Sequence, residues 1–443
     1  MKIVIAGAGE VGGHLAKLLS NENQDVIIID NDESKLACLD SYNLLTHNGS
    51  PTSFEILNSA GVNSADLYIA VTPYETRNVT SCAMAKSLGA KKTVARVDNY
   101  EFFSPVNRAF FASIGVDELI YPEYLAAEEI VTALKRSWAK NWFELYNGEL
   151  IVVGVKLTED AELVGIKLKE LSGIARYLHI AAIKHNDETI IPRGDDVIHA
   201  NDTVYFATKK EYIDEILKVC NKEQIDINKI MIMGGSRIAL RTSIMTGDKR
   251  KIKIIDNDMA KCNSLAEKLP YCSIVYGDGR DIEILKDDGI ENCDAFIALT
   301  DSSETNILAC IAAKQLGVNK TIAEVENLHF ISGAEGLNIG TIVNKKLLAS
   351  SHIFQIMLDT DSSSTKCLAL ADAEVAKLTA KEGSKITKAP VMELSLSRDM
   401  TIAGLIRDEK GMLVQGNTHI QAGDQVVVFC LHGSLYKTEK LFS

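Results

Sequence analysis

The chain has 443 residues, of which 46% are hydrophobic and 24% are charged, so it is neither a disordered nor a fibrous protein. Its 47 Lys and Arg residues against 60 Asp and Glu residues give a net charge of −13, which argues against a nucleic-acid partner. No apolar run approaches the roughly 20 residues of a membrane-spanning helix, and we therefore expect a soluble, cytoplasmic protein with about two to four domains.

Nine cysteines and nine histidines are scattered along the chain. The cysteines form no C-x-x-C pair, and their ordinary state in such a protein is that of reduced thiols. The histidines show no H-x-x-x-H spacing, and none lies beside a cysteine pair. The spacing therefore predicts no zinc or iron site.

The first 30 residues predict a dinucleotide-binding βαβ unit. A short apolar run at 2–6 ends in the loop GAGEVG at 7–12, and an amphipathic helix follows. A second apolar run, 26–29, ends at Asp30, which lies 21 residues after the middle glycine. A lone G-x-G-x-x-G is a weak signal, but strand, loop, helix, second strand and acid together are typical of this unit.

The residues of this unit have separate expected roles. Gly7 allows the tight turn, Gly9 lets the backbone approach a pyrophosphate, and Gly12 lets the helix pack close to the strand. The helix N-terminus offers free N–H groups and a partial positive charge to phosphates. Asp30 accepts hydrogen bonds from ribose hydroxyls and repels a 2′-phosphate, so NAD, ADP or ATP is favoured over NADP. The alternative is the same fold with a vestigial pocket.

Four more short apolar runs extend this unit to a doubly wound parallel sheet of six strands. They lie at 44–46, 67–71, 93–97 and 118–121. Ligands bind outside the carboxyl ends of such strands, where the sequence places Thr72, Pro73 and Arg96. Arg96 either pairs with a phosphate or forms a surface salt bridge.

The chain repeats itself with an offset of 226 to 228 residues, which predicts a second Rossmann unit. The matched pairs include Asp30 with Asp256, Gly49 with Gly277, Thr72 with Thr300, Asn78 with Asn306 and Arg96 with Glu324. The second loop, GGSRIA at 234–239, has Ser236 in place of the middle glycine, where the side chain either crowds a pyrophosphate or donates to it. Arg237 could contact a phosphate and Asp256 marks the ribose position, so a working second site and a degenerate one both stay open.

A β-rich segment of another kind follows each Rossmann unit. The two segments share a polar turn before a final apolar strand, at 200–207 and 423–430, which predicts small α+β modules. An amphipathic helix precedes each module. The apolar stripes of these helices are Leu125, Ile130, Val131 and Leu134 in the first helix and Leu347, Leu348, Ile353 and Ile356 in the second. We expect the stripes to be exposed and to drive assembly by packing on a partner Rossmann lobe, the alternative being packing within the same lobe.

The expected architecture is α/β, with two doubly wound Rossmann-like parallel-sheet domains, each followed by a crossover helix and a small α+β module. The expected boundaries are 1–122 for the first Rossmann domain, 123–145 for the crossover helix and linker, 146–222 for the first small module, 226–344 for the second Rossmann domain, 345–360 for the second crossover helix and 361–443 for the second small module.

This order of domains resembles the cytosolic nucleotide-binding subunits of Trk potassium uptake systems, whose repeated unit is the RCK domain. The resemblance covers nearly the whole chain and rests on GAGEVG with Asp30, on GVDELIYPEYLAAEEI at 115–130 and on TDSSETN at 300–306. It implies a regulatory subunit, not an enzyme, that binds NAD or NADH, with ADP and ATP as alternative ligands. It also implies a homo-oligomer, expected as a tetrameric ring, at the inner face of the cell membrane. There it would gate an integral membrane potassium-transporting subunit by nucleotide-dependent conformational change.

The resemblance maps nucleotide-binding positions onto both units and implies no catalytic residue and no metal ligand. In the first unit the positions are Gly7, Ala8, Gly9, Glu10, Val11, Asp30, Thr72, Pro73 and Arg96, and in the second they are Gly234, Gly235, Ser236, Arg237, Ile238, Asp256, Thr300 and Glu324. The first unit departs from the family pattern, because it reads TPYETRN at 72–78 and Gly49-Ser50 where the second has Gly277-Asp278. The two units therefore need not bind the same nucleotide or ion.

A function of another class is that of an NAD-dependent dehydrogenase, which needs an acid or base facing the nicotinamide. The modules after the Rossmann units are too small to enclose a substrate, and neither gathers His, Asp and Arg at a recognisable spacing. A third interpretation adds a ligand sensor in the small modules, with a cyclic dinucleotide near Ile406 and Arg407.

Overall fold

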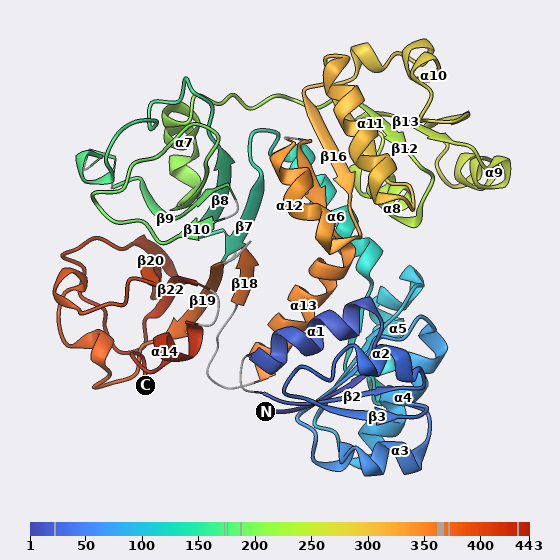
Figure 1. The fold of residues 1–443 in the computed structure, drawn as a ribbon, viewed down its shortest axis with the longest axis horizontal. Helices are drawn as coiled ribbons and strands as arrows, with labels where there is room; N and C mark the ends of the chain where they lie inside the picture. Colours follow the sequence, from blue (N-terminus) through green and yellow to red (C-terminus); the bar gives the residue numbers. More distant parts are fainter. Residues whose placement is uncertain are drawn as a thin grey trace. The chain divides into compact units, whose positions relative to one another are not determined.

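The computed structural model describes residues 1–443 with the exception of 22–23, 147, 172, 175, 187, 338, 361–366, 371–372 and 432–433 (Figure 1). The chain forms two compact units. Unit 1 contains Met1–Ala126 and Lys345–Asp361, and unit 2 contains Ala127–Asn344 and Ser362–Ser443. None of the described helices is both long enough and apolar enough to cross a membrane.

Unit 1 is built on a six-stranded parallel sheet with the order β3-β2-β1-β4-β5-β6. Its strands are β1 Lys2–Ala6, β2 Asp25–Asp30, β3 Leu45–Asn48, β4 Leu67–Ala70, β5 Lys92–Arg96 and β6 Glu118–Ile120. The helices between them are α1 Glu10–Asn21, α2 Glu33–Ala37, α3 Phe54–Ser59, α4 Glu75–Leu88 and α5 Pro105–Ser113. The strand order reverses between β1 and β4, which is where doubly wound sheets bind their ligands. The predicted six-stranded parallel sheet is confirmed.

The central strands of this sheet are apolar along their whole length because both faces of the sheet are covered. Ile3 and Ile5 of β1 pack in one core, and Val4 and Ala6 pack in the core on the opposite face. All four side chains are fully buried. Burial on both faces explains why the sequence shows continuous apolar runs and no alternation.

Helix α13, Lys345–Thr360, follows the second Rossmann domain in sequence but lies in unit 1. It packs beside α1 (Figure 1), with Ala349 and Ile353 in the core of the first sheet. Lys346 forms an ion pair with Glu10 at the start of α1. The apolar stripe of this helix is therefore buried within the chain itself.

Unit 2 contains the second Rossmann domain, a parallel sheet with the order β14-β13-β12-β15-β16-β17. Its strands are β12 Lys229–Met233, β13 Lys251–Asp256, β14 Ser273–Tyr276, β15 Ala295–Ala298, β16 Lys320–Glu324 and β17 Thr341–Val343. Its helices are α8 Arg237–Thr246, α9 Met259–Lys268, α10 Ile282–Asp287, α11 Ser303–Gln315 and α12 Leu328–Gly336. The order is the same as in the first domain, so the predicted duplication of the Rossmann unit is confirmed.

Helix α6, Pro122–Lys135, follows the first Rossmann domain in sequence, but most of it lies in unit 2. The side chains of Ile130 and Leu134 are fully buried there. The Lys320 ammonium, at the start of β16, donates to the main-chain carbonyl of Ala139 just after the helix, at 3.2 Å. This contact joins the end of the helix segment to the second Rossmann sheet.

The two crossover helices are thus exchanged, each lying in the unit that holds the Rossmann domain of the other repeat. The expectation that a partner lobe covers the stripes holds for a partner lobe within the same chain. The expectation that the stripes are exposed for assembly between chains is wrong, because Ile130, Leu134 and Ile353 are buried within a single chain.

The two small modules are five-stranded, largely antiparallel sheets in unit 2, with the orders β10-β9-β11-β8-β7 and β18-β19-β22-β20-β21. The first module contains β7 Asn141–Leu145, β8 Leu150–Lys156, β9 Leu178–His185, β10 Glu188–Ile190, β11 Thr203–Thr208 and α7 Ile213–Val219. The second contains β18 Cys367–Leu370, β19 Ala373–Thr379, β20 Met400–Arg407, β21 Lys410–Leu413, β22 Gln425–Leu431 and α14 Leu435–Glu439. The predicted small modules are confirmed.

Strand β7 lies in the range 123–145, which the sequence assigned to the crossover helix and linker, so that part of the prediction is wrong. Trp142 packs in the core of the first module, whereas Leu145 packs in a core that also contains Val375 and Phe429 of the second module. A five-residue strand whose side chains enter two different cores shows no alternation by which the sequence could reveal it.

Candidate functional site

Both glycine loops follow the first strand of their sheet and lead into a helix. Gly7 has a φ of +109° and Gly234 a φ of +100°, a conformation that glycine adopts without steric cost. A Cβ on Gly12 would lie 1.8 Å from the carbonyl oxygen of Gly7, so the first loop requires glycine there. A Cβ on Gly9 would meet no atom within 4 Å, which leaves open space beside the backbone. This geometry fits the roles expected of the three glycines in the first loop.

The second loop differs because Ser236 is the N-cap of α8. Its hydroxyl oxygen accepts a hydrogen bond from the Ala239 N–H at 3.3 Å. Ile238 and Ala239 are buried, whereas Arg237, the first residue of the helix, is exposed. The serine therefore has a structural role that the sequence analysis did not foresee.

The two acids predicted to hold ribose are tied to the glycine loops by their own carboxylates. Asp30 Oδ2 accepts from the Ala8 N–H at 2.6 Å, and Asp256 Oδ2 accepts from the Gly235 N–H at 2.6 Å. In each acid, Oδ1 accepts from the N–H two residues further on, at 2.9 and 2.8 Å. A carboxylate has about four acceptor sites, so both acids keep capacity for a ribose hydroxyl while their orientation is fixed.

A buried asparagine organises the strand ends of the first crevice, and the sequence analysis used it only as a repeat match. Asn78 Oδ1 accepts from the Thr72 N–H at 2.9 Å and from its hydroxyl at 2.6 Å. Asn78 Nδ2 donates to the carbonyl oxygens of Thr72 and Arg96, both at 2.9 Å. The asparagine is fully buried, so it joins the ends of β4 and β5 without contacting a ligand itself.

The second domain repeats this arrangement atom for atom. Asn306 Oδ1 accepts from the Thr300 N–H at 3.0 Å and from its hydroxyl at 2.7 Å. Asn306 Nδ2 donates to the carbonyl oxygens of Thr300 and Glu324, at 2.8 and 2.9 Å. The signal in the sequence is the spacing T-x-x-x-x-x-N, which occurs at the same place in both repeats.

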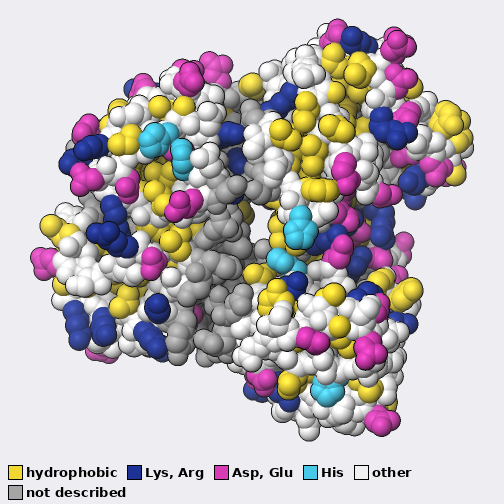
Figure 2. Space-filling model, in the orientation of Figure 1, with side chains coloured by type: hydrophobic (Ala, Val, Ile, Leu, Met, Phe, Trp, Pro, Cys, Tyr) yellow, Lys and Arg dark blue, Asp and Glu magenta, His cyan; other side chains and the backbone are white. Residues whose placement is uncertain are grey.

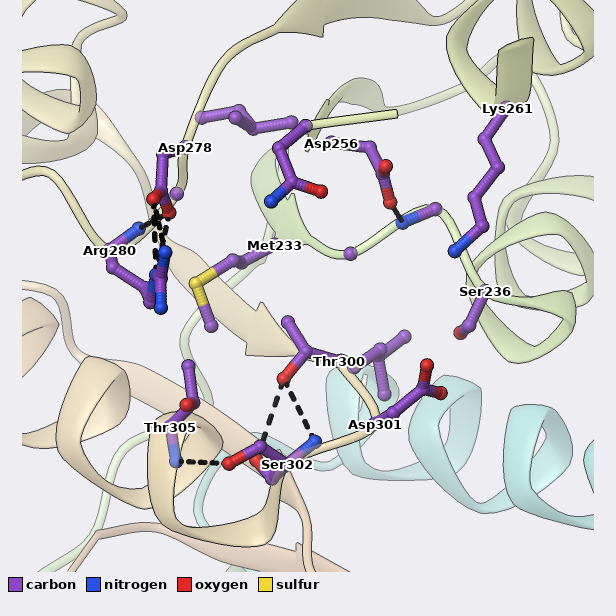
Figure 3. Close-up of a pocket in the computed structure, with 16 residues that line it drawn as sticks. Met233, Ser236, Asp256, Lys261, Asp278, Arg280, Thr300, Asp301, Ser302 and Thr305 are labelled. Carbon is purple, nitrogen blue, oxygen red and sulfur yellow. Dashed lines mark hydrogen bonds and ion pairs between the residues drawn. The ribbon is translucent and has the colours of Figure 1, made fainter. Parts of the chain in front are cut away.

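In the second domain the crevice is a cavity of about 280 Å³ at the carboxyl ends of β12, β13 and β15 (Figure 3). The predicted residues that line it are Gly234, Gly235, Ser236, Asp256 and Thr300. Lys261 of α9 extends toward Ser236 at one end of the cavity, and an ion pair between Asp278 and Arg280 lies at the other. The cavity therefore combines a glycine loop, a ribose-type acid and two cationic groups, which suits an anionic ligand with hydroxyl groups.

The Asp278–Arg280 pair and Lys261 are lining residues that the sequence analysis missed. Arg280 Nε and Nη2 donate to the two oxygens of Asp278 at 2.9 and 2.6 Å. These hydrogen bonds hold the pKa of Asp278 below its usual value, so the carboxylate stays ionised at neutral pH. The only signal in the sequence is that polar residues follow the third strand directly.

Three predicted residues are not brought to a cavity. Arg96 Nη2 lies 3.4 Å from Asp98 Oδ1, which corresponds to the salt-bridge alternative. Glu324 is buried at the end of β16 and is not among the described residues that line the cavity. Pro73 is exposed beside the buried Thr72.

Comparison with known proteins gives matches over both repeats. The TrkA-N domain profile matches residues 3–122 and 230–345, and the TrkA-C domain profile matches residues 152–221 and 375–443. The chain is similar to the Trk system potassium uptake protein TrkA homolog 1 of Methanosarcina mazei, at 30% identity over 452 residues covering all of both chains.

Solved structures share the fold at low sequence identity. The crystal structure of the GsuK RCK domain is 16% identical with a TM-score of 0.61, and the match covers 99% of this chain and 94% of that one. The structure described as the GsuK channel bound to NAD is also 16% identical, with a TM-score of 0.60 and coverage of 100% and 78%.

Proposed function

The chain belongs to the TrkA family of Trk potassium uptake proteins, and from that premise we propose that it gates a membrane potassium transporter in response to bound nucleotide. As a member of this family it is a regulatory component of potassium transport and not an enzyme. The observation that carries the nucleotide part of the proposal is the pair of acids, Asp30 and Asp256, that are hydrogen-bonded to the two glycine loops.

The proposed ligand is NAD or NADH, with ADP and ATP as alternatives. A fixed carboxylate at each ribose position accepts hydroxyl hydrogen bonds and repels a 2′-phosphate, which disfavours NADP. The N-termini of α1 and α8 supply N–H groups to phosphates. The GsuK channel, which shares the fold, has been solved bound to NAD, and this also supports the proposal.

The proposed first-site residues are those of the glycine loop, Asp30 and Thr72, and the proposed second-site residues are those lining the cavity in Figure 3. We expect the first crevice to bind more tightly, because Gly9 leaves open space beside the loop whereas the second loop carries a capping serine there.

The proposed partner is an integral membrane subunit, with this chain assembled as a homo-oligomeric ring on the inner face of the membrane. A nucleotide shifts a conformational equilibrium only by its differential affinity for the two states. The usual coupling of about 1–3 kcal/mol corresponds to roughly a 5–150-fold change in a population, and hence in transport.

Titration calorimetry on the full chain tests the nucleotide sites. Asp30→Arg replaces an acceptor with a donor-only cation, so it should abolish NAD binding at the first crevice and leave the second unchanged. Asp256→Arg is the matched variant and should remove only the weaker site. If both variants keep the wild-type affinities and stoichiometry, ribose is held elsewhere and the assignment of the acids is wrong.

Potassium flux through the reconstituted membrane partner tests the regulatory part. ATP, a non-hydrolysable analogue and ADP should each set a steady level of flux, and the analogue should replace ATP. Steady ATP hydrolysis, with the analogue inactive, would exclude a binding equilibrium as the switch.

A further inference from the structure

Three side chains with metal-binding atoms converge on the surface of the first small module. His185 is the last residue of β9, and His199 and Asp202 lie in the turn that leads into β11. The Nδ1 atom of His185 lies 2.6 Å from Asp202 Oδ1, and that of His199 lies 3.7 Å from Asp202 Oδ2. One ligand atom from each residue lies within 4.8 Å of the other two. The cluster is separate from both nucleotide crevices and is independent of the proposed function.

The carboxylate of this cluster is held rigidly while the imidazoles face solvent. Asp202 is 1% exposed, and its Oδ2 also accepts the His199 main-chain N–H at 2.8 Å. The side chains of His185 and His199 are 53% and 62% exposed. Figure 2 shows histidine side chains on the surface over this module. An ion can therefore enter from solvent and meet an oriented oxygen ligand.

The second small module shows which part of this arrangement the fold itself requires. Asp424, 222 residues after Asp202, is 2% exposed and accepts a main-chain N–H from Gln421 at 2.8 Å, as Asp202 does from His199. Its charge is balanced by Arg407, whose Nε and Nη2 donate to the two carboxylate oxygens at 2.8 and 2.6 Å. The buried aspartate and its turn are therefore common to both modules.

The partners of the aspartate differ between the modules in a way that matters for metal binding. The position of Arg407 is taken by His185, and that of Gln421 is taken by His199. A guanidinium has no lone pair to offer, whereas a neutral imidazole is among the commonest metal ligands. Since an arginine satisfies the buried carboxylate in the same fold, two imidazoles are not needed for folding.

We propose that His185, His199 and Asp202 bind a divalent first-row transition metal ion, with Zn²⁺ as the representative. Two imidazole nitrogens and one carboxylate suit zinc and its neighbours, whereas Mg²⁺ and Ca²⁺ prefer oxygen ligands throughout. Ligand atoms on a tetrahedral zinc, at about 2.0–2.1 Å from the ion, lie roughly 3.3 Å apart. Small side-chain rotations bring the three ligand atoms to that spacing, and water completes the coordination on the exposed side. This metal site was not predicted from the spacing of the histidines.

Equilibrium dialysis and calorimetry with ZnCl₂ test the site on the full chain after treatment with a chelator. All variants carry Cys38→Ser, because the exposed Cys38 thiol offers another zinc ligand. The parent should bind one Zn²⁺ tightly, and His185→Asn and His199→Asn should each weaken binding by about tenfold or more. His199→Asn keeps the main-chain N–H that orients Asp202, so it removes a ligand without loosening the turn. His419→Asn, in the second module, is the matched control and should bind zinc as the parent does.

A second readout separates ligation from a general effect on folding. Substitution of Co²⁺ should give the d–d absorption of a low-coordinate site in the parent and the control, and this absorption should be lost in both cluster variants. A hundredfold excess of Mg²⁺ should not displace the ion. Equal zinc affinity in the parent and both cluster variants, or displacement by Mg²⁺, would overturn the proposal.

Discussion

The buried ammonium of Lys320 predicts a pH dependence of stability that is specific to unit 2. Burial, and secondarily the nearby charge of Lys314, lowers its pKa from 10.5 to about 8, while Glu129 opposes the shift. Its ammonium donates to the main-chain carbonyls of Ser137 and Ala139, both at 3.2 Å. At about 1.4 kcal/mol per pH unit, the difference between the two pKa values corresponds to about 3 kcal/mol.

The sign follows from proton binding. Between pH 8 and 10.5 the unfolded lysine is protonated and the folded one is not, so the unfolded state binds more protons and the free energy of unfolding rises with pH. Below pH 8 both states are protonated, and the full cost of burying the ammonium is present. Lys320→Met removes the titrating group, so the variant should lack this rise.

Calorimetric melting of unit 2 between pH 7 and 10.5 measures the effect. Other titrating groups are common to the parent and the variant, so the difference between their melting curves isolates Lys320. Relative to the variant, the parent should gain a few degrees in Tm across this range, with the exposed Lys251→Met as the control that follows the parent. Parallel curves for the parent and Lys320→Met would show that the ammonium is not buried as the structure has it.

Three other substitutions test the architecture of the domains. Asn78→Asp places an oxygen where two carbonyls accept from an amide and should cost at least about 3 kcal/mol, so melting of unit 1 should fall while that of unit 2 stays unchanged. Gly12→Ala forces the loop carbonyl at Gly7 to move, so it should weaken nucleotide binding at the first crevice alone, as measured by calorimetry. Ile353→Glu strands a charge in the core of unit 1 and should lower its Tm, because the cost is several kcal/mol. Unchanged melting of Ile353→Glu together with a smaller oligomer by light scattering would return that stripe to a contact between chains.

The strands and glycine loops of both Rossmann domains could be predicted from the sequence because their signals are local. Two-sided burial gives continuous apolar runs, and a positive φ requires glycine at Gly7 and Gly234. The repeat offset then carries the prediction to the second domain. The acids were found in the same way, since Asp30 and Asp256 each end a strand at a fixed distance from the loop.

The features that were missed depend on contacts between distant residues. The buried hydrogen bonds of Asn78 become visible only when two strand ends lie side by side. The His185–Asp202 contact needs β9 and β11 to pair, because no short spacing links these residues. The exchange of the crossover helices has no local signal, since an amphipathic stripe records that it must be buried but not which sheet covers it.

The helix exchange also sets the order in which the protein can be completed on the ribosome. Unit 1 is interrupted after Ala126 and resumes only at Lys345, so about 220 residues are made before α13 is available. At roughly 5–20 residues per second, the first sheet waits about 10–40 s with the α1 face uncovered. During that time its apolar side chains, Leu15 and Leu19 among them, are open to wrong partners. The N-terminal domain, although synthesised first, is therefore among the last parts of the chain to finish folding.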